Sequence, residues 1–364
     1  MKQNLILVGA GAVTEAAYLW VTLRLPWWRY GGSLQSWRDL LGAVDGAFLT
    51  CLAGALLLLA LYITGWHAVR GLSPRQQKRQ GRLVWTFALL YSITLFWLMP
   101  ITSDLFNYLG QAHLFTDLGA NPLVEPALEV NQAIEAIEGS PDPLLSTYMT
   151  AYASTPSIYG PGWTLISAPA TWLSSSYFIG LLYLKGLAWL AFLASAYLLK
   201  RIVEKLRPSS AAEALYLFSW NPLVLLMAVG DGHNDAVMMA AVLLGFWFVL
   251  RDSWALAFGV MAFSASIKYV GALFIPLIAL YAWDRSRTGE RGRPLLVLLQ
   301  GGLAAGVVAG LLYAALGSAE WGTGLFNRIL VPQNWAWKGN LVWPPTLLLA
   351  GGLVACLAAY LGLA

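Results

Sequence analysis

The stretch LVWTFALLYSITLFWLMPITSDLFNY, residues 83–108, decides the fold class of this chain. Its first part, 83–100, is an apolar run long enough to cross the ~30 Å hydrocarbon core of a bilayer. Asp104 follows soon after this run, and Tyr108 lies one helical turn further on. Because a carboxylate at the rim of a bilayer is costly, the stretch predicts a membrane helix that leads into a reaction site rather than a solvated face.

The composition of the whole chain indicates the same class. Of 364 residues, 59% are hydrophobic and only 11% are charged, which leaves too little polar surface for a soluble globule. We therefore predict an all-α, polytopic integral membrane protein, folded as a single domain over residues 1–364, with about eight spanning helices. The predicted spans are 4–23, 47–65, 83–100, 177–199, 211–229, 236–250, 295–316 and 342–363.

The distribution of charge predicts the orientation in the membrane. Lysine and arginine cluster at 70–82, 200–207 and 285–293, and such clusters in short loops are retained on the cytoplasmic side. The segment 101–156 holds several acids but no lysine or arginine, so we expect a large helical loop on the extracytoplasmic side, with a short helix at 129–138. Since membrane topology accounts for the basic residues, the net charge of +4 does not indicate nucleic-acid binding.

Two regions are not expected to span the membrane. This topology requires 157–173 to be a re-entrant or interfacial segment. The runs 254–267 and 269–283 are each short for a crossing, and basic residues flank both on the cytoplasmic side. A hairpin of two half-helices with Lys268 at its buried tip satisfies these constraints, and one long tilted helix is the alternative.

Asp104 is the first candidate for chemistry. As a general base it would accept a proton from a hydroxyl group, while its partly apolar surroundings raise its pKa toward a useful value. Asn107 and Tyr108, about one turn away, would orient the carboxylate or a bound substrate. The alternative is structural, since an acid after Thr102 and Ser103 also caps a helix whose first turn is 104–108.

A second cluster, Asp231, His233, Asn234 and Asp235, lies in a turn between two apolar runs without a base to neutralise it. Ionisable residues this close to a bilayer indicate function by default, and this mixture suits hydrogen bonding to sugar hydroxyls. The alternative is a linker in which Asp231 or Asn234 caps the following helix. One histidine beside acids is a weak signal for a divalent cation, so we predict no metal site.

Lys268 stands alone in the apolar segment SASIKY, where an unpaired ammonium would be costly. A lipid-linked phosphate would supply the anionic partner, with the amine stabilising the phosphate as it leaves. Snorkelling to the surface or pairing with an internal acid is the alternative. Arg328 and Lys338 are further phosphate candidates, although the tryptophans at 335 and 337 beside them are also typical of membrane anchors.

Taken in order, these motifs resemble the bacterial polyprenol-phosphate-mannose-dependent α-1,6-mannosyltransferases of the GT-C superfamily. The resemblance covers about residues 101–282. The residues that carry it are Asp104-Leu-Phe-Asn-Tyr108, Gln111, Gly119, Asn121-Pro122, Asp142-Pro143, Thr155-Pro156, Tyr159-Gly160-Pro161-Gly162-Trp163, Asn221-Pro222-Leu223, Gly232-His233-Asn234-Asp235 and the Lys268 segment.

The resemblance implies a GT-C-type fold and an inverting hexosyltransferase of the bacterial plasma membrane. Such an enzyme moves a sugar, mannose first, from a polyprenyl-phosphate donor to a glycan or lipid acceptor at the extracytoplasmic face. Asp104 matches the general base of the superfamily, and Tyr159 joins the candidates for substrate binding. Lysine and arginine alone can neutralise the charge of a lipid monophosphate, so no metal and no cofactor are expected.

A transporter or flippase of lipid-linked or polar substrates is the main rival, because broken helices and a midplane lysine would also serve a substrate path. The chain shows no inverted repeat, and transport does not require a large acidic outer loop. A non-catalytic scaffold for an envelope complex is a third reading. Replacing Asp104 by asparagine separates them, because only the transferase needs this proton acceptor.

Overall fold

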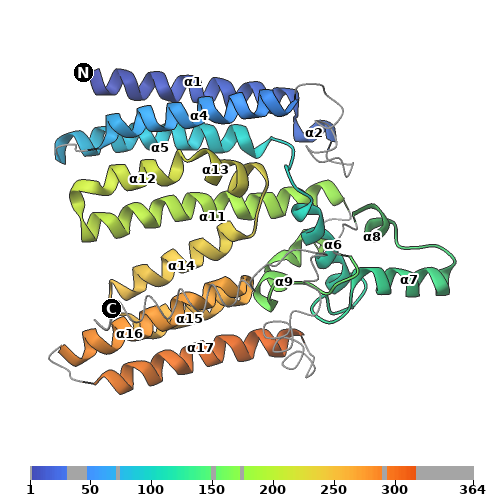
Figure 1. Cartoon of the computed structure of the whole chain (residues 1–364). Coiled ribbons are helices and arrows are strands. Elements are labelled where there is room, and N and C mark those ends of the chain that lie inside the picture. Colours follow the sequence, from blue (N-terminus) through green and yellow to red (C-terminus); the bar gives the residue numbers. More distant parts are fainter. Residues whose placement is uncertain are drawn as a thin grey trace, which may run out of the picture. The chain divides into compact units, whose positions relative to one another are not determined.

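The computed structural model describes residues 2–30, 47–70, 74–148, 153–172, 176–288 and 293–316. These residues form helices and no strand, apart from a single antiparallel bridge between Pro26 and Leu98 (Figure 1). The all-α prediction is therefore confirmed. Contacts divide the chain into the units 1–312 and 313–364, and everything below concerns the first unit unless stated otherwise.

Four described helices are long and apolar enough to cross a membrane by themselves. A fifth candidate is a broken span, in which Pro208–Ser219 and Pro222–Gly230 are inclined by 54° to each other. It consists of the 3₁₀ turn η1 (Pro208–Ser210), α12 (Ala211–Ser219), α13 (Pro222–Leu225) and the π-helical turn η2 (Leu226–Gly230). The four unbroken helices are α1 (Lys2–Arg24), α4 (Ala47–Val69), α11 (Tyr177–Leu206) and α17 (Pro294–Leu316).

The predicted count of about eight spanning helices is not confirmed. The run 83–100 belongs to α5 (Pro74–Phe96), which begins inside a basic segment, so its apolar part is shorter than a full crossing. The run 236–250 forms α14 (Asp235–Val249), which has only 15 residues. The predicted helix 342–363 lies outside the described residues.

The segment around Lys268 is a hairpin and not one long helix. α15 (Trp254–Ile267) ends where Lys268 adopts an extended backbone with φ −146° and ψ 127°. The 3₁₀ turn η3 (Tyr269–Leu273) and α16 (Phe274–Thr288) follow. The rings of Trp254 and Tyr281 lie 6.2 Å apart, which brings the start of α15 beside the second half of α16. The hairpin with Lys268 at its tip is therefore confirmed, but the lysine is half-buried where a buried position was expected.

The described part of the predicted outer loop, 101–148 and 153–156, is largely helical. It contains α6 (Asp104–Thr116), α7 (Ala127–Glu138) and α8 (Pro143–Tyr148), so the helix expected at 129–138 is confirmed. The segment after it forms α9 (Pro161–Ser167) and α10 (Pro169–Trp172), each far too short for a crossing. The remaining short helix, α2 (Trp27–Tyr30), follows α1.

One hydrophobic cluster fixes the start of α6 against the membrane helices. Leu105 and Leu109 of α6 are fully buried together with Leu184 of α11, Met238 of α14 and Ile267 of α15. Burying such a side chain stabilises the fold by roughly 1.5–3 kcal/mol. Because these apolar neighbours flank Asp104, their packing decides where its carboxylate points.

Candidate active site

The candidate site lies where three segments meet: the start of α6, the turn at 230–234 that follows η2, and the tip of the α15–α16 hairpin. Gly232 shapes the turn, because its φ of 76° is strained for other residues. A Cβ atom at this position would also lie only 3.0 Å from Leu105 of α6. Glycine therefore lets the turn pack directly on α6 and brings Asp231 and His233 to Asp104.

Asp231 is the buried anchor of the site, with a side chain that is 0% exposed. Its Oδ1 accepts hydrogen bonds from the backbone N–H groups of Ile101 at 2.6 Å and Thr102 at 2.7 Å, and its Oδ2 accepts one from the Thr102 hydroxyl at 2.9 Å. Oδ2 also lies 2.7 Å from Nε2 of His233. Burial by itself raises the pKa of Asp231, but the bonds from His233 and Thr102 outweigh it and hold the pKa below its ordinary value.

His233 links the two carboxylates. Its Nδ1 lies 3.2 Å from Oδ2 of Asp104, while its Nε2 faces Asp231. Only the doubly protonated ring can donate on both sides. Burial lowers the pKa of His233, but the hydrogen bond to Asp231 and the charges of Asp231 and Asp104 outweigh this and raise the pKa above its ordinary value. The arrangement therefore favours an imidazolium between two carboxylates.

Asp104 is the reactive end of this chain of contacts, because its side chain is 25% exposed. It is the first residue of α6, as expected, but Ser103 is the N-cap residue and the carboxylate is directed to His233. Burial raises the pKa of Asp104, and the charges of His233 and Lys268 oppose that rise. Oδ1 has no hydrogen-bond partner among the residues the structure covers, so it is free to accept a proton.

Lys268 is paired with an acid inside the site. Its ammonium lies 2.7 and 2.8 Å from the two carboxylate oxygens of Asp235, which is the pairing that the sequence left open as the alternative. The two side chains are 30% and 48% exposed. A pair this exposed contributes only about 0–1 kcal/mol, so an anionic ligand can compete with Asp235 for the lysine.

Aromatic side chains form a wall behind Asp104. The ring of Tyr108 packs edge-on against Tyr159 and Trp163, with ring centres 5.2 and 4.9 Å away. Its hydroxyl accepts the backbone N–H of Asn234 at 3.5 Å. Tyr108 and Asn234 are both fully buried, and neither polar atom of the Asn234 side chain has a hydrogen-bond partner in the described part of the chain. Both polar atoms of the Asn234 side chain are therefore available for hydrogen bonds to a ligand.

Three predicted site residues are not found in this cluster of described residues. Asn107 lines a separate, small hollow of about 30 Å³, together with Gln111, Glu125 and Ser157. Arg328 and Lys338 lie outside the described residues. Across the described ranges, no group of three or more histidine, cysteine, aspartate or glutamate side chains is arranged to hold a metal ion.

Lys185 is a site neighbour to which the sequence analysis gave no role. This residue of α11 is fully buried, donates a hydrogen bond to the carbonyl oxygen of Leu98, and places its ammonium 4.8 Å from the ring centre of Trp27. The turn packs on its stem, since a Cβ at Gly232 would lie 3.6 Å from Lys185 Cγ. Its signal in the sequence is a lone lysine in an apolar run.

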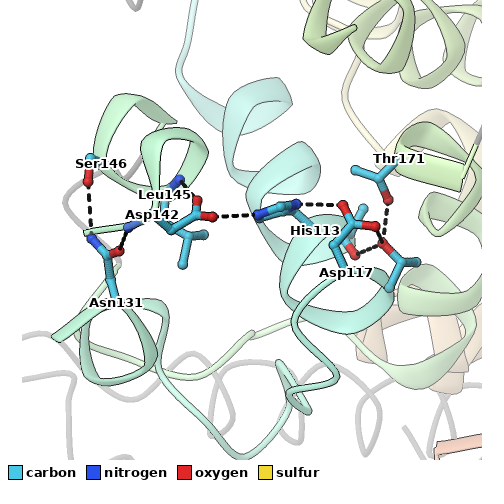
Figure 2. A network of polar contacts seen from close by, with 9 residues as sticks. His113, Asp117, Asn131, Asp142, Leu145, Ser146 and Thr171 are labelled. Atoms are coloured by element: carbon cyan, nitrogen blue, oxygen red, sulfur yellow. Dashed lines mark hydrogen bonds and ion pairs between the residues drawn. The ribbon is translucent and has the colours of Figure 1, made fainter. Parts of the chain in front are cut away.

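A second histidine between two aspartates was also missed. Figure 2 shows His113 of α6 between Asp117, 2.6 Å from Nδ1, and Asp142, 3.1 Å from Nε2. Asp142 is held by its own bonds, since its backbone N–H donates to Asn131 at 2.7 Å and its Oδ1 accepts the N–H of Leu145 at 2.8 Å. This network fastens α6 to the start of α8 and so orders the loop around the site.

Comparison with known proteins gives the family. The model of the family "Alpha-(1->6)-mannopyranosyltransferase, N-terminal domain" matches residues 5–284. Over 316 residues, the chain is 24% identical to Alpha-(1->6)-mannopyranosyltransferase A of Mycobacterium tuberculosis, which covers 85% of this chain and 54% of that protein.

Two proteins of Corynebacterium glutamicum also match. Alpha-(1->6)-mannopyranosyltransferase A is 24% identical over 51% of this chain and 36% of its own length. Alpha-(1->6)-mannopyranosyltransferase B is 26% identical over 43% and 26%, respectively. The chain thus spans about half the length, or less, of the curated relatives it matches. No solved structure matches it significantly. Because the family model matches most of the chain and confirms the resemblance carried by its motifs, this integral membrane protein belongs to the alpha-(1->6)-mannopyranosyltransferase family.

Proposed function

We propose that this chain is an inverting glycosyltransferase that moves mannose from a polyprenyl-phosphate donor to a glycan or lipid acceptor at the extracytoplasmic face of the membrane. Family membership and the names of its relatives support the transfer of mannose. The observation that carries the proposal is the chain of contacts from Asp231 through His233 to Asp104, next to the ammonium of Lys268. A proton acceptor beside a cation suited to a phosphate supports this proposal.

The reaction needs one displacement. As the acceptor oxygen forms its bond to the anomeric carbon, its O–H bond breaks and the proton passes to Asp104 Oδ1. The bond between the anomeric carbon and the phosphate oxygen breaks at the same time, and its electron pair stays on the phosphate. General-base help of this kind contributes about 10²–10⁴-fold in rate. No covalent sugar intermediate is required.

His233 and Asp231 hold the carboxylate of Asp104 in position through a chain of hydrogen bonds. The imidazolium donates to Asp104 Oδ2 and fixes the carboxylate, which leaves Oδ1 for the acceptor. Asp231, ionised and held by two backbone N–H groups, keeps the ring in its orientation. The same logic orients imidazole rings beside buried carboxylates in hydrolases.

Lys268 supplies positive charge for the departing phosphate. Because the pair with Asp235 is partly exposed and weak, the donor phosphate replaces the carboxylate, and Asp235 is then free to bind a sugar hydroxyl. Arg328 and Lys338 remain proposed phosphate ligands. A lipid monophosphate carries little enough charge for these side chains, so the proposal includes no metal.

Replacement of Asp104 by asparagine tests the proposal. Purified protein in detergent is incubated with radiolabelled polyprenyl-phosphate mannose and candidate glycan or lipid acceptors, and transferred label is counted. We expect Asp104→Asn to lower the rate by about 10²–10⁴-fold. The control is Glu135→Gln, an equally conservative change at an exposed acid of α7, which should keep the rate within about twofold.

Two results would contradict the proposal. One is an Asp104→Asn variant that keeps more than about a tenth of the rate, since the proton acceptor would then be elsewhere. The other is a wild-type protein that moves lipid-linked sugar between the two leaflets of vesicles without forming any glycosidic bond. The unfolding temperature of each variant shows whether lost activity reflects lost structure.

A further inference from the structure

A second hollow lies at the N-terminal end of α5, far along that helix from the segment that leads to Asp104. Four elements surround it: α5, the last turns of α11, η1 and the first turn of α12. It encloses about 520 Å³, room for a ligand of headgroup size. Its lining residues are Gln77, Lys78, Gly81, Arg82, Trp85, Lys200, Glu204, Pro208, Ser209, Ala211 and Ala212.

The hollow has an excess of positive charge. Lys78 and Arg82 lie one turn apart on α5, and Lys200 faces them from α11. The single acid in the lining, Glu204, is already 2.8 Å from Lys200. Lys78 and Arg82 have no ion pair within the part of the chain that the structure covers. Like charges one turn apart repel each other, so both side chains favour an anion in the hollow.

The start of α12 adds to this positive potential. Gln77 of α5 ties the segment down, since it donates to the carbonyl oxygen of Ser209 and accepts the backbone N–H of Ala212 at 3.2 Å. Ser210, the N-cap residue of α12, makes no side-chain capping bond. The positive end of the α12 dipole therefore lies at the hollow, and its effect is small because Gln77 already accepts one N–H group and Glu213 is an acid in the same turn.

The position of the hollow along the helices indicates where the anion comes from. On α5 the apolar run begins at Leu83, directly after Arg82, and on α11 it ends directly before Lys200. Trp85 lies one turn inside the apolar part of α5, as is typical of tryptophan at the level of lipid headgroups. The hollow thus opens at the boundary between hydrocarbon and water.

We propose that this hollow binds the phosphate of an anionic phospholipid. Lys78 and Arg82 hold the phosphate oxygens, and the glycerol and upper acyl chains lie along Trp85. Basic pockets between membrane helices are suited to such headgroups. A soluble phosphate would bind the same cations but would have no apolar part to contact Trp85 and the apolar rim. The site is separate from the proposed transferase site and does not depend on its activity.

Native mass spectrometry of the detergent-purified protein, titrated with phosphatidylglycerol, tests the proposal. Arg82→Gln is compared with Arg79→Gln, which removes the same charge from an exposed neighbour on α5 that does not line the hollow. We expect Arg82→Gln to weaken binding about fivefold and the double change Lys78→Gln/Arg82→Gln about thirtyfold, whereas Arg79→Gln stays within about twofold. Arg82→Lys, which keeps the charge, should bind within about twofold of wild type.

Three results would overturn the proposal. Equal losses in Arg79→Gln and Arg82→Gln would show attraction by the whole surface and no site. Equal binding of phosphatidylcholine would show that the anionic charge is not recognised. Displacement of the lipid by roughly 10 mM inorganic phosphate would show a site for soluble phosphate. None of these measurements uses sugar transfer, so their outcome does not depend on whether the proposed enzyme activity is found.

Discussion

Replacing His233 by glutamine should move the acid limb of the pH–rate profile to higher pH. In the proposed reaction Asp104 must be ionised, so kcat/KM rises with pH through the pKa of this carboxyl group. Burial already raises that pKa above its ordinary value of about 3.9. The positive charge of His233 opposes the rise. Without that charge the ionised form of Asp104 is less stable, so its pKa must increase.

The geometry gives the size of this shift. His233 Nδ1 lies 3.2 Å from Asp104 Oδ2, and the Asp104 side chain is 25% exposed. Two unit charges about 4 Å apart interact by roughly 1 kcal/mol in water and roughly 4 kcal/mol near a protein surface. For a partly exposed pair we take about 2 kcal/mol, which corresponds to about 1.5 pH units.

The assay measures kcat/KM for transfer of labelled mannose between about pH 4.5 and pH 9, a range set by the ordinary pKa values of aspartate and histidine. His113→Gln is the matched control, because this histidine also lies between two aspartates but contacts neither Asp104 nor Asp231. Its acid limb should coincide with that of wild type. Coincident limbs for His233→Gln and wild type, both with measurable rates, would refute the electrostatic coupling between His233 and Asp104.

A stability measurement checks the same contact without activity. The pKa of His233 is raised in the folded protein, so its contribution to stability is fully present below about pH 6.5 and is lost as pH rises through the raised value. The unfolding temperature of wild type should therefore exceed that of His233→Gln most clearly near pH 6, and the gap should narrow above that range. A gap that is constant from pH 6 to pH 9 would contradict the assigned charge of the ring.

Two further substitutions probe the packing that builds the site. Gly160→Ala should lower the free energy of unfolding by about 1–3 kcal/mol, because a Cβ atom there would overlap the carbonyl oxygen of Ser266. Gly186→Ala is the control in thermal unfolding, because Gly186 has open space around it. Equal unfolding temperatures for the two variants would count against this close contact. Lys185→Met should destabilise the protein by about 1–3 kcal/mol, because it leaves the carbonyl oxygen of Leu98 without the buried lysine that donates to it, and an unfolding temperature equal to that of wild type would show that this hydrogen bond contributes nothing to stability.

Local patterns in the sequence determined the class of fold and several elements. The apolar runs and the low charge predict membrane helices, and the short runs on either side of Lys268 predict the hairpin that the structure contains. The spacing at 129–138 predicts a helix in the same way, and the structure extends it to Ala127–Glu138. The spanning count was less predictable, because α5 and α14 combine helical pattern with too few apolar residues for a crossing.

The tertiary structure alone decided which polar groups meet. Asp104 and His233 are far apart in the sequence, and no periodic pattern relates them. They come together because Leu105 and Met238 are buried in one cluster and because Gly232 allows the turn to reach α6. Helix propensity depends on neighbours within a few residues, whereas ion pairs such as this one depend on the packing of whole helices. For that reason the sequence could name Asp104 as a candidate base but could not show that His233 fixes it or that Lys185 lies behind it.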